Sequence, residues 1–274
     1  MSLLGRCYYR VCETRAGHRV VRDLVVGARR LGGLRRFHLP VEALALDHAS
    51  TAELMRLWSR IHWSSRDGMM PPDQLLAVYR LAAECPVRGD VVELGAWVGL
   101  TTSYLATACI AHGEGRVYAV DTFEGMKEGG GRYTSIRRYG GNTLGAFTEQ
   151  IRRAGVEDVV EPLVGRTQDM ARMYPGGPIR LLLIDADHSY EGVRRDFELW
   201  SPHVRPGGIV VFHDYHMLGV SRFVDQEVRP RSEWESKPGL VAPKTMAFTR
   251  RAARRHVSPH SVAKFWRGGM RSPS

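Results

Sequence analysis

Residues 181–215 read LLLIDADHSYEGVRRDFELWSPHVRPGGIVVFHDY, and this stretch decides the fold. The apolar run at its start predicts a strand that ends at Asp185, and a second run over 209–212 predicts a strand that ends at His213-Asp214. Between the runs, apolar residues three or four positions apart predict a helix. A strand, a helix and a strand joined by a right-handed crossover make the two strands parallel.

Ionisable side chains follow both of these strands, namely Asp185, His188, His213 and Asp214. Neighbouring parallel strands lie about 4.8 Å apart, so we expect these four side chains to converge at one edge of the sheet. In open parallel sheets, this is the edge where ligands bind. A set of helix caps and turn residues is the alternative, and it is the weaker interpretation for four ionisable groups in one crevice. Asp187 fits a helix cap better than a ligand.

Strands and helices alternate along the rest of the chain, which predicts a doubly wound α/β sheet with helices on both faces. The sheet is expected to be mostly parallel, with an antiparallel last strand supplied by a closing hairpin. Predicted strands cover 91–94, 116–120, 158–164, 179–184 and 245–249, the last within a hairpin over 232–250. Predicted helices cover 51–62, a segment opened by Pro71-Pro72, 100–111, 146–154, 167–173 and 219–229. The turn Arg205-Pro206-Gly207-Gly208 is expected to precede the fifth strand.

We divide the chain into a basic N-terminal extension with entry helices (1–68), one α/β domain (69–250) and a basic tail (251–274). The net charge of +10 over 274 residues is concentrated at the ends. Residues 1–40 carry nine arginines and two acids, and residues 250–274 carry six arginines, one lysine and no acid. Basic ends on a mildly acidic body favour solvated tails over a nucleic-acid interface.

Several classes of protein are disfavoured by composition. No apolar run reaches the roughly 18 residues of a membrane span, and the first residues lack the apolar core of a signal peptide. We therefore expect a cytoplasmic protein with no membrane partner. The four cysteines show no zinc-type spacing, and we expect no disulfides.

A glycine-containing turn follows the first predicted strand, in Glu93-Leu94-Gly95-Ala96-Trp97-Val98-Gly99. Gly95 permits the tight turn, and Gly99 lets the next helix begin close to the strand. Trp97 stands where a dinucleotide motif has glycine, so a dinucleotide is disfavoured. Asp121 ends the second strand, 28 positions after Glu93, and an acid there suits the hydroxyls of a ribose. Structural turns and a helix cap remain alternatives for these residues.

Five segments occur in a consistent order: ELGAWVGLTT, VYAVDTFEG, GRTQDM, IDADHSYEG and RPGGIVVFHDY. Together they resemble the class I S-adenosylmethionine (SAM)-dependent methyltransferases. Within that class the chain is similar to the macrocin and other sugar O-methyltransferases, and more distantly to the catechol and caffeoyl-CoA enzymes. The resemblance covers roughly residues 69–250. It implies a Rossmann-like methyltransferase fold with SAM as cofactor and methyl transfer to a hydroxyl of a small molecule.

The resemblance also implies contacts with the cofactor. By that similarity, Glu93, Gly95 and Gly99 line the methionine end of SAM, Asp121 holds the ribose, Thr167 and Gln168 contact adenine, and Asp185 lies beside the cofactor. A helix N-cap is a second interpretation for Thr167, and it is compatible with the first.

For the chemical step, the resemblance implies metal ligands at Asp185, His213 and Asp214 and a general base at His188. A divalent cation, Mg²⁺ or Mn²⁺, would lower the pKa of the acceptor hydroxyl. Imidazole is a poor ligand for Mg²⁺ and a good one for transition metals. Three possibilities therefore stay open: His213 binds a transition metal, it lies beside a Mg²⁺ held by the two acids, or no metal is used and both histidines act as bases.

Some features allow more than one function. The Gly- and Arg-rich segment 125–145 has no core pattern and is either a lid over an anionic acceptor or a surface insertion. An RNA methyltransferase that uses the basic ends is one competing function, although aromatic stacking groups do not alternate with the basic residues there. A SAM-binding protein without methyl transfer is another. We expect a homo-oligomer, a dimer or higher.

Overall fold

The computed structural model describes residues 48–61, 68–125, 136–237 and 244–252. Residues 1–47 and 62–67 of the predicted extension 1–68, and 253–274 of the predicted tail 251–274, lie outside the described residues, so the proposed division of the chain stays a prediction. Among the described helices, none has both the length and the apolar composition needed to cross a bilayer.

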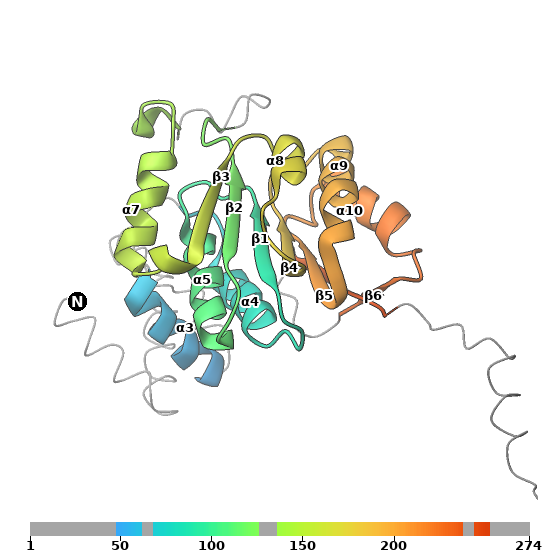
Figure 1. Cartoon of the computed structure of the whole chain (residues 1–274), viewed down its shortest axis with the longest axis horizontal. Coiled ribbons are helices and arrows are strands. Elements are labelled where there is room, and N and C mark those ends of the chain that lie inside the picture. The colour runs from blue at the N-terminus through green and yellow to red at the C-terminus, as the bar shows by residue number, and fades with distance from the viewer. Residues whose placement is uncertain (1–47, 62–67, 126–135, 238–243, 253–274) are drawn as a thin grey trace, which may run out of the picture.

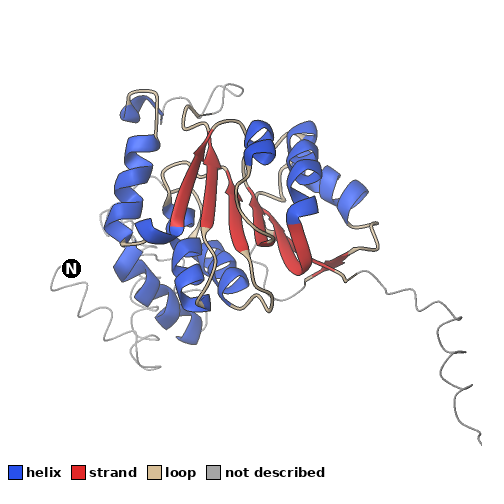
Figure 2. Ribbon diagram, viewed as in Figure 1, coloured by secondary structure: helices blue, strands red, loops and turns tan. Residues whose placement is uncertain are grey.

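Seven strands form one sheet in the order β3-β2-β1-β4-β5-β7-β6. The first five are mutually parallel, β7 runs antiparallel to β5, and β6 runs antiparallel to β7. The doubly wound sheet with an antiparallel end is therefore confirmed, and Figure 2 shows it between two groups of helices. The strands are β1 (Asp90–Leu94), β2 (Val117–Asp121), β3 (Val160–Val164), β4 (Ile179–Ile184), β5 (Val204–Phe212), β6 (Trp234–Ser236) and β7 (Met246–Arg250).

The helices lie in two groups, one on each side of the sheet (Figure 1). One group is α3 (His48–Ile61), α4 (Pro72–Ala83), α5 (Leu100–His112) and α7 (Leu144–Ala154), and the other is α8 (Thr167–Met173), α9 (Tyr190–Trp200) and α10 (Leu218–Phe223). Successive strand residues point to opposite faces, so Leu181 joins the core under the first group and Leu182 the core under the second. Strands buried on both faces read as continuous apolar runs, which is why the sequence revealed them.

Two predicted boundaries are wrong for reasons of backbone geometry. The predicted turn at 205–208 lies inside β5, where Gly207 has φ of +85° and the β4–β5 register shifts between Ile179 and Leu181. The glycines thus bend a strand instead of reversing the chain. The single helix predicted over 219–229 is α10 followed by a π-helix at Val224–Val228.

Smaller differences concern the segments before β3. A 3-10 helix at Glu157–Val159 replaces the start of the predicted strand, and α7 begins two residues earlier than predicted. Within the segment predicted to lack a core pattern, Ile136 and Thr143 are buried, and Arg137–Tyr139 forms a 3-10 helix. Residues 126–135 of that segment lie outside the described part, so its role as a lid stays a prediction.

A fully buried arginine ties the amino edge of the sheet together. Arg180 in β4 is 0% exposed, and its guanidinium donates to the backbone carbonyls of Ala82, Gly89 and Glu114. One side chain therefore holds the end of α4 and the segments that lead into β1 and β2. Its guanidinium also lies 3.3 Å from the sulfur of Cys109, which is a buried free thiol.

Candidate active site

The four ionisable residues predicted to converge do lie together at the carboxyl ends of β4 and β5. His213 Nδ1 lies 2.9 Å from Asp185 Oδ1. His188 Nε2 lies 3.4 Å from the same oxygen and 3.3 Å from Asp214 Oδ2. Ile184 and Phe212 are paired in the sheet, so the residues that follow them enter the same space.

The backbone after β5 brings two consecutive side chains to this place. Asp214 has φ of +52°, a left-handed conformation that aspartate tolerates better than most residues. Its carbonyl accepts a hydrogen bond from the amide of Met217, which fixes the reversal of the chain. Gly219 then approaches the loop after β4 closely, since a Cβ there would lie 2.2 Å from the carbonyl oxygen of His188. The loops after β4 and β5 are therefore packed backbone to backbone.

His213 is held from both sides. Its Nδ1 faces Asp185, and its Nε2 lies 2.6 Å from Oε1 of Gln74, a buried side chain of α4. Burial acts to lower the pKa of His213, but the hydrogen bond and charge of Asp185, together with Asp214, outweigh it and raise that pKa. Both ring nitrogens face acceptors, so the geometry suits the imidazolium form.

Gln74 was missed by the sequence reasoning. The only signal was a polar residue among the apolar positions of a predicted helix, beside Leu75 and Leu76. Such a pattern indicates that the polar side chain is buried, but it does not indicate which residue it contacts.

A group of three that overlaps the predicted ligand set could hold a metal ion. One donor atom from each of Asp185, His188 and Asp214 lies within 4.8 Å of the other two. The group includes His188, which was predicted to be the base, whereas the ring nitrogens of His213 face Asp185 and Gln74. Two carboxylates and an imidazole are a donor set that suits Mn, Fe, Co, Ni or Zn. The role of His213 as a ligand stays a prediction.

The side chain of Asp185 is a partly buried carboxylate that contacts the two histidines. Burial acts to raise the pKa of Asp185, but hydrogen bonds and charge from His188 and His213 outweigh it and lower that pKa. Asp185 is therefore ionised at neutral pH.

Asp187 was predicted to cap α9, and this prediction is wrong. Ser189 occupies the N-cap position, and its side chain accepts a hydrogen bond from the amide of Gly192. Asp187 instead accepts from the amide of Ser189.

The glycine turn after β1 touches the loop that carries Asp185. Gly95 has φ of +95°, and a Cβ there would lie 2.2 Å from the carbonyl oxygen of Asp185. Gly99, with φ of +81°, precedes the first residue of α5. Both glycines are therefore required by the backbone, and the predicted cofactor turn lies directly beside the ionisable cluster.

Asp121 fastens this turn to the end of β2. Its Oδ2 accepts from the amide of Trp97 and its Oδ1 from the amide of Phe123, each at 2.8 Å. Burial raises the pKa of Asp121 despite these hydrogen bonds, which act to lower it. The amides of Ala96 and Thr122 also act on this carboxylate, and its contact with a ribose stays a prediction.

Glu93 is a buried carboxyl in β1, just before the glycine turn. It is 1% exposed, and its Oε2 accepts from the hydroxyl of Thr102 at 2.5 Å. Burial raises the pKa of Glu93 to about 8, and the charges of Asp185 and Asp121 act in the same direction. Burial therefore favours the neutral form of this carboxyl, and its predicted contact with the methionine end of SAM stays a prediction.

The segment predicted to contact adenine lies at the same edge of the sheet. The amide of Gly165 donates to the carbonyl of Asp121, and α8 begins at Thr167. Thr167 is not the N-cap, because that position is occupied by Arg166 and Thr167 is the first helical residue. Thr167 and Gln168 are partly exposed.

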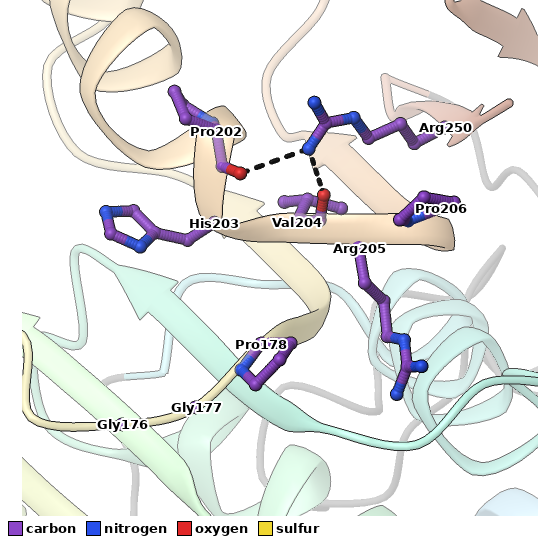
Figure 3. Close-up of a pocket in the computed structure, with 9 residues that line it drawn as sticks. All are labelled: Gly176, Gly177, Pro178, Pro202, His203, Val204, Arg205, Pro206 and Arg250. Carbon is purple, nitrogen blue, oxygen red and sulfur yellow. Dashed lines mark hydrogen bonds between the residues drawn. The ribbon is translucent and has the colours of Figure 1, made fainter. Parts of the chain in front are cut away.

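A shallow depression of about 470 Å³ lies at the opposite edge, around the amino ends of β4 and β5 (Figure 3). The two arginines that line it form hydrogen bonds with backbone carbonyls. Arg250 donates to the carbonyls of Pro202 and Val204, and Arg205 donates to the carbonyl of Arg88. The depression is therefore separate from the ionisable cluster.

Comparison with known proteins agrees with the resemblance found in the sequence. Residues 92–215 match the model of a family described as a methyltransferase domain. This range contains both the glycine turn and the ionisable cluster. The similarity to class I SAM-dependent methyltransferases is thereby confirmed.

One curated relative is the 8-demethyl-8-(2,3-dimethoxy-alpha-L-rhamnosyl)-tetracenomycin-C 4'-O-methyltransferase of Streptomyces olivaceus, 33% identical over 142 residues. The match covers 47% of this chain and 54% of that enzyme, so the chain spans about half the length of this relative. An uncharacterised protein of Acanthamoeba polyphaga mimivirus is 34% identical over 74 residues, which are 27% of this chain and 30% of that protein.

Among solved structures, the O-methyltransferase NovP superposes with a TM-score of 0.52 at 20% identity. The superposition covers 65% of this chain and 81% of that one. This likeness supports the fold, and it agrees with the Rossmann-like methyltransferase architecture expected from the sequence.

Proposed function

We propose that this protein is a SAM-dependent O-methyltransferase that acts on a hydroxyl of a small molecule, such as a sugar or a glycosylated natural product. The observation that carries the proposal is the cluster of Asp185, His188, His213 and Asp214 in backbone contact with the glycine turn at Gly95. The family match and the name of the Streptomyces relative support it.

Methyl transfer from a sulfonium to a hydroxyl is an in-line displacement, so the protein must position the two reactants and remove a proton. His188 is placed to take that proton at Nδ1, which has no hydrogen-bond partner among the described residues, while Asp185 and Asp214 at its Nε2 would stabilise the resulting imidazolium. His213 orients Asp185, and Gln74 orients His213. The chain of contacts therefore runs from Gln74 in α4 through His213 and Asp185 to His188.

A divalent cation fits the same donor set. Asp185, His188 and Asp214 would hold it, and their two carboxylates and one imidazole match the preferences of a transition metal or manganese. When bound, the cation would lower the pKa of the acceptor hydroxyl and orient it. His188 serves as a ligand in that case and as a base when no cation is used, and chelation separates the two mechanisms.

If the cation takes part, excess EDTA should abolish most of the turnover, and Mn²⁺ should restore it. With an imidazole among the ligands, Mn²⁺, Co²⁺ or Ni²⁺ should outperform Mg²⁺. Turnover is measured by mass spectrometry of the methylated acceptor, and bound metal by elemental analysis. Full turnover in excess EDTA, with no metal in the protein, would leave His188 as the base and remove the cation from the mechanism.

Replacing Asp121 with alanine should weaken SAM binding by about 1.5–3 kcal/mol, the contribution of hydrogen bonds to a charged group. Calorimetric titration gives the affinity. The substitution also frees the amides of Trp97 and Phe123, so an analogue lacking the ribose hydroxyls serves as the comparison. If Asp121 binds the ribose, the analogue should bind wild type weakly and lose little more in the variant. Equal losses for both ligands would assign Asp121 to the turn alone.

The reaction itself is tested by incubating the protein with SAM and a panel of glycosylated aromatic compounds and detecting the added methyl group. Transfer to RNA, with binding that weakens steeply as salt increases, would favour the nucleic-acid alternative instead. Cytoplasmic location and a homo-oligomeric state stay predictions.

A further inference from the structure

Helix α9 holds the first residue of α8 at two points. The hydroxyl of Thr167 donates to Oδ1 of Asp196 at 2.5 Å, and the indole nitrogen of Trp200 donates to the carbonyl of Thr167 at 3.1 Å. Asp196 and Trp200 are four residues apart, so they lie on the same face of α9. In Figure 1 this helix stands beside α8. One helix thus fixes both the side chain and the backbone of Thr167.

Asp196 is an unusual group to find in this position. It is 1% exposed, and its Oδ2 is buried without a hydrogen-bond partner among the described residues. Burial raises the pKa of Asp196 to about 7, against the hydrogen bond from Thr167, and the charge of Asp187 adds to the increase. A buried carboxyl that is only half satisfied destabilises the fold. Joining two helices does not require it, because an apolar residue would pack there without that cost.

The residue that Asp196 holds stands at the candidate cofactor site. Thr167 and Gln168 are partly exposed and follow β3 at the edge of the sheet that carries Asp121. A group that restrains Thr167 therefore restrains the segment that faces the nucleoside of a bound cofactor. Asp187, whose side chain lies against Gly192 one turn before Asp196, places a second acid on the same side of α9.

We propose that Asp196 and Trp200 are positioning residues that clamp Thr167 and so fix the 167–168 segment for binding the nucleoside of SAM. The proposal rests on the proposed function, because it is SAM whose nucleoside is bound. Neither residue needs to touch the cofactor: both act through Thr167, whose order before binding reduces the entropy lost when the ligand binds.

The test uses S-adenosylhomocysteine, which has the same nucleoside and needs no acceptor, in calorimetric titrations of the full chain. Thr167→Val removes the hydroxyl and keeps the shape of the side chain, whereas Thr167→Ser keeps the hydroxyl. Thr107→Val is the matched control, because Thr107 is a threonine whose hydroxyl likewise donates a hydrogen bond inside the protein, to the carbonyl of Ser103 within α5. We expect Thr167→Val to weaken binding about 5- to 20-fold, as for one lost hydrogen bond and a loosened segment. Thr107→Val should bind within about twofold of wild type, and Thr167→Ser should recover most of the affinity that Thr167→Val loses.

Asp196 is tested in the same way. Asp196→Ala should weaken binding as much as Thr167→Val, and Asp196→Asn should recover most of the affinity because its amide oxygen can still accept from Thr167. Binding by Thr167→Val within about twofold of wild type would overturn the clamp, and so would an equal loss in Thr107→Val, since both outcomes separate Thr167 from binding. If wild type itself does not bind S-adenosylhomocysteine, the proposed function fails and the clamp fails with it. Circular dichroism of each variant separates unfolding from weakened binding.

Discussion

Replacing His188 with alanine should lower the maximal rate of methyl transfer by about 10²–10⁴-fold, the usual contribution of a general acid or base. The affinity for SAM should stay nearly unchanged. The reason is positional: Nε2 of His188 faces the carboxylates after β4 and β5, whereas the candidate nucleoside contacts follow β2 and β3. Steady-state kinetics with a methylatable acceptor and calorimetric titration with SAM measure the two quantities separately.

His216 supplies a control for this experiment. Its side chain is 49% exposed, and its Nδ1 lies 3.5 Å from the other oxygen of Asp214. His216→Ala removes an imidazole from the same carboxylate and should change the rate far less. If His188→Ala abolishes SAM binding or leaves the rate unchanged, the assignment of His188 as the base is wrong.

Replacing Arg180 with methionine should lower the free energy of unfolding by about 3–5 kcal/mol. Methionine fills much of the volume but donates nothing, so the carbonyls of Ala82, Gly89 and Glu114 lose their donor in a buried place. Urea denaturation followed by circular dichroism measures the change. The effect should appear as a lower midpoint at an unchanged slope.

Arg205→Met is the matched control. Arg205 donates to one carbonyl at the surface, that of Arg88, where water can replace it. We expect a loss within about 0.5 kcal/mol for this variant, as for most surface substitutions. A loss below about 1 kcal/mol for Arg180→Met would mean that the carbonyls find other donors and that Arg180 is not a principal support of this edge.

The fold was largely predictable because its strands are buried on both faces and therefore appear as apolar runs between helices of period 3.6. The strand at 179–184 and the helix at 167–173 were placed at their observed bounds. The prediction of a turn at 205–208 was wrong because the sequence Pro-Gly-Gly is compatible both with a turn and with an irregular strand. The π-helix at Val224–Val228 was not predicted because its apolar residues have the spacing of an ordinary α-helix.

The candidate site was predictable where ionisable residues directly follow a predicted strand. Asp185, His213 and Asp214 end two strands, and the topology alone brings them together. Gln74 was not predictable, because it meets His213 across 139 positions of sequence, and periodicity carries no information about such a partner. The link between Asp196 and Thr167 was missed for the same reason, since an acid on a helix is usually expected at the surface.

The contact between Gly95 and the carbonyl of Asp185 limits how such an enzyme can evolve. Any side chain at Gly95 would meet that oxygen at 2.2 Å and displace the acid, so a change made for the cofactor would also disturb the chemistry. A substitution at Gly95 should therefore affect both the glycine turn and the ionisable cluster. Under the proposed function, directed evolution toward a new acceptor should leave Gly95 unchanged and begin at exposed residues that follow β5, such as Leu218.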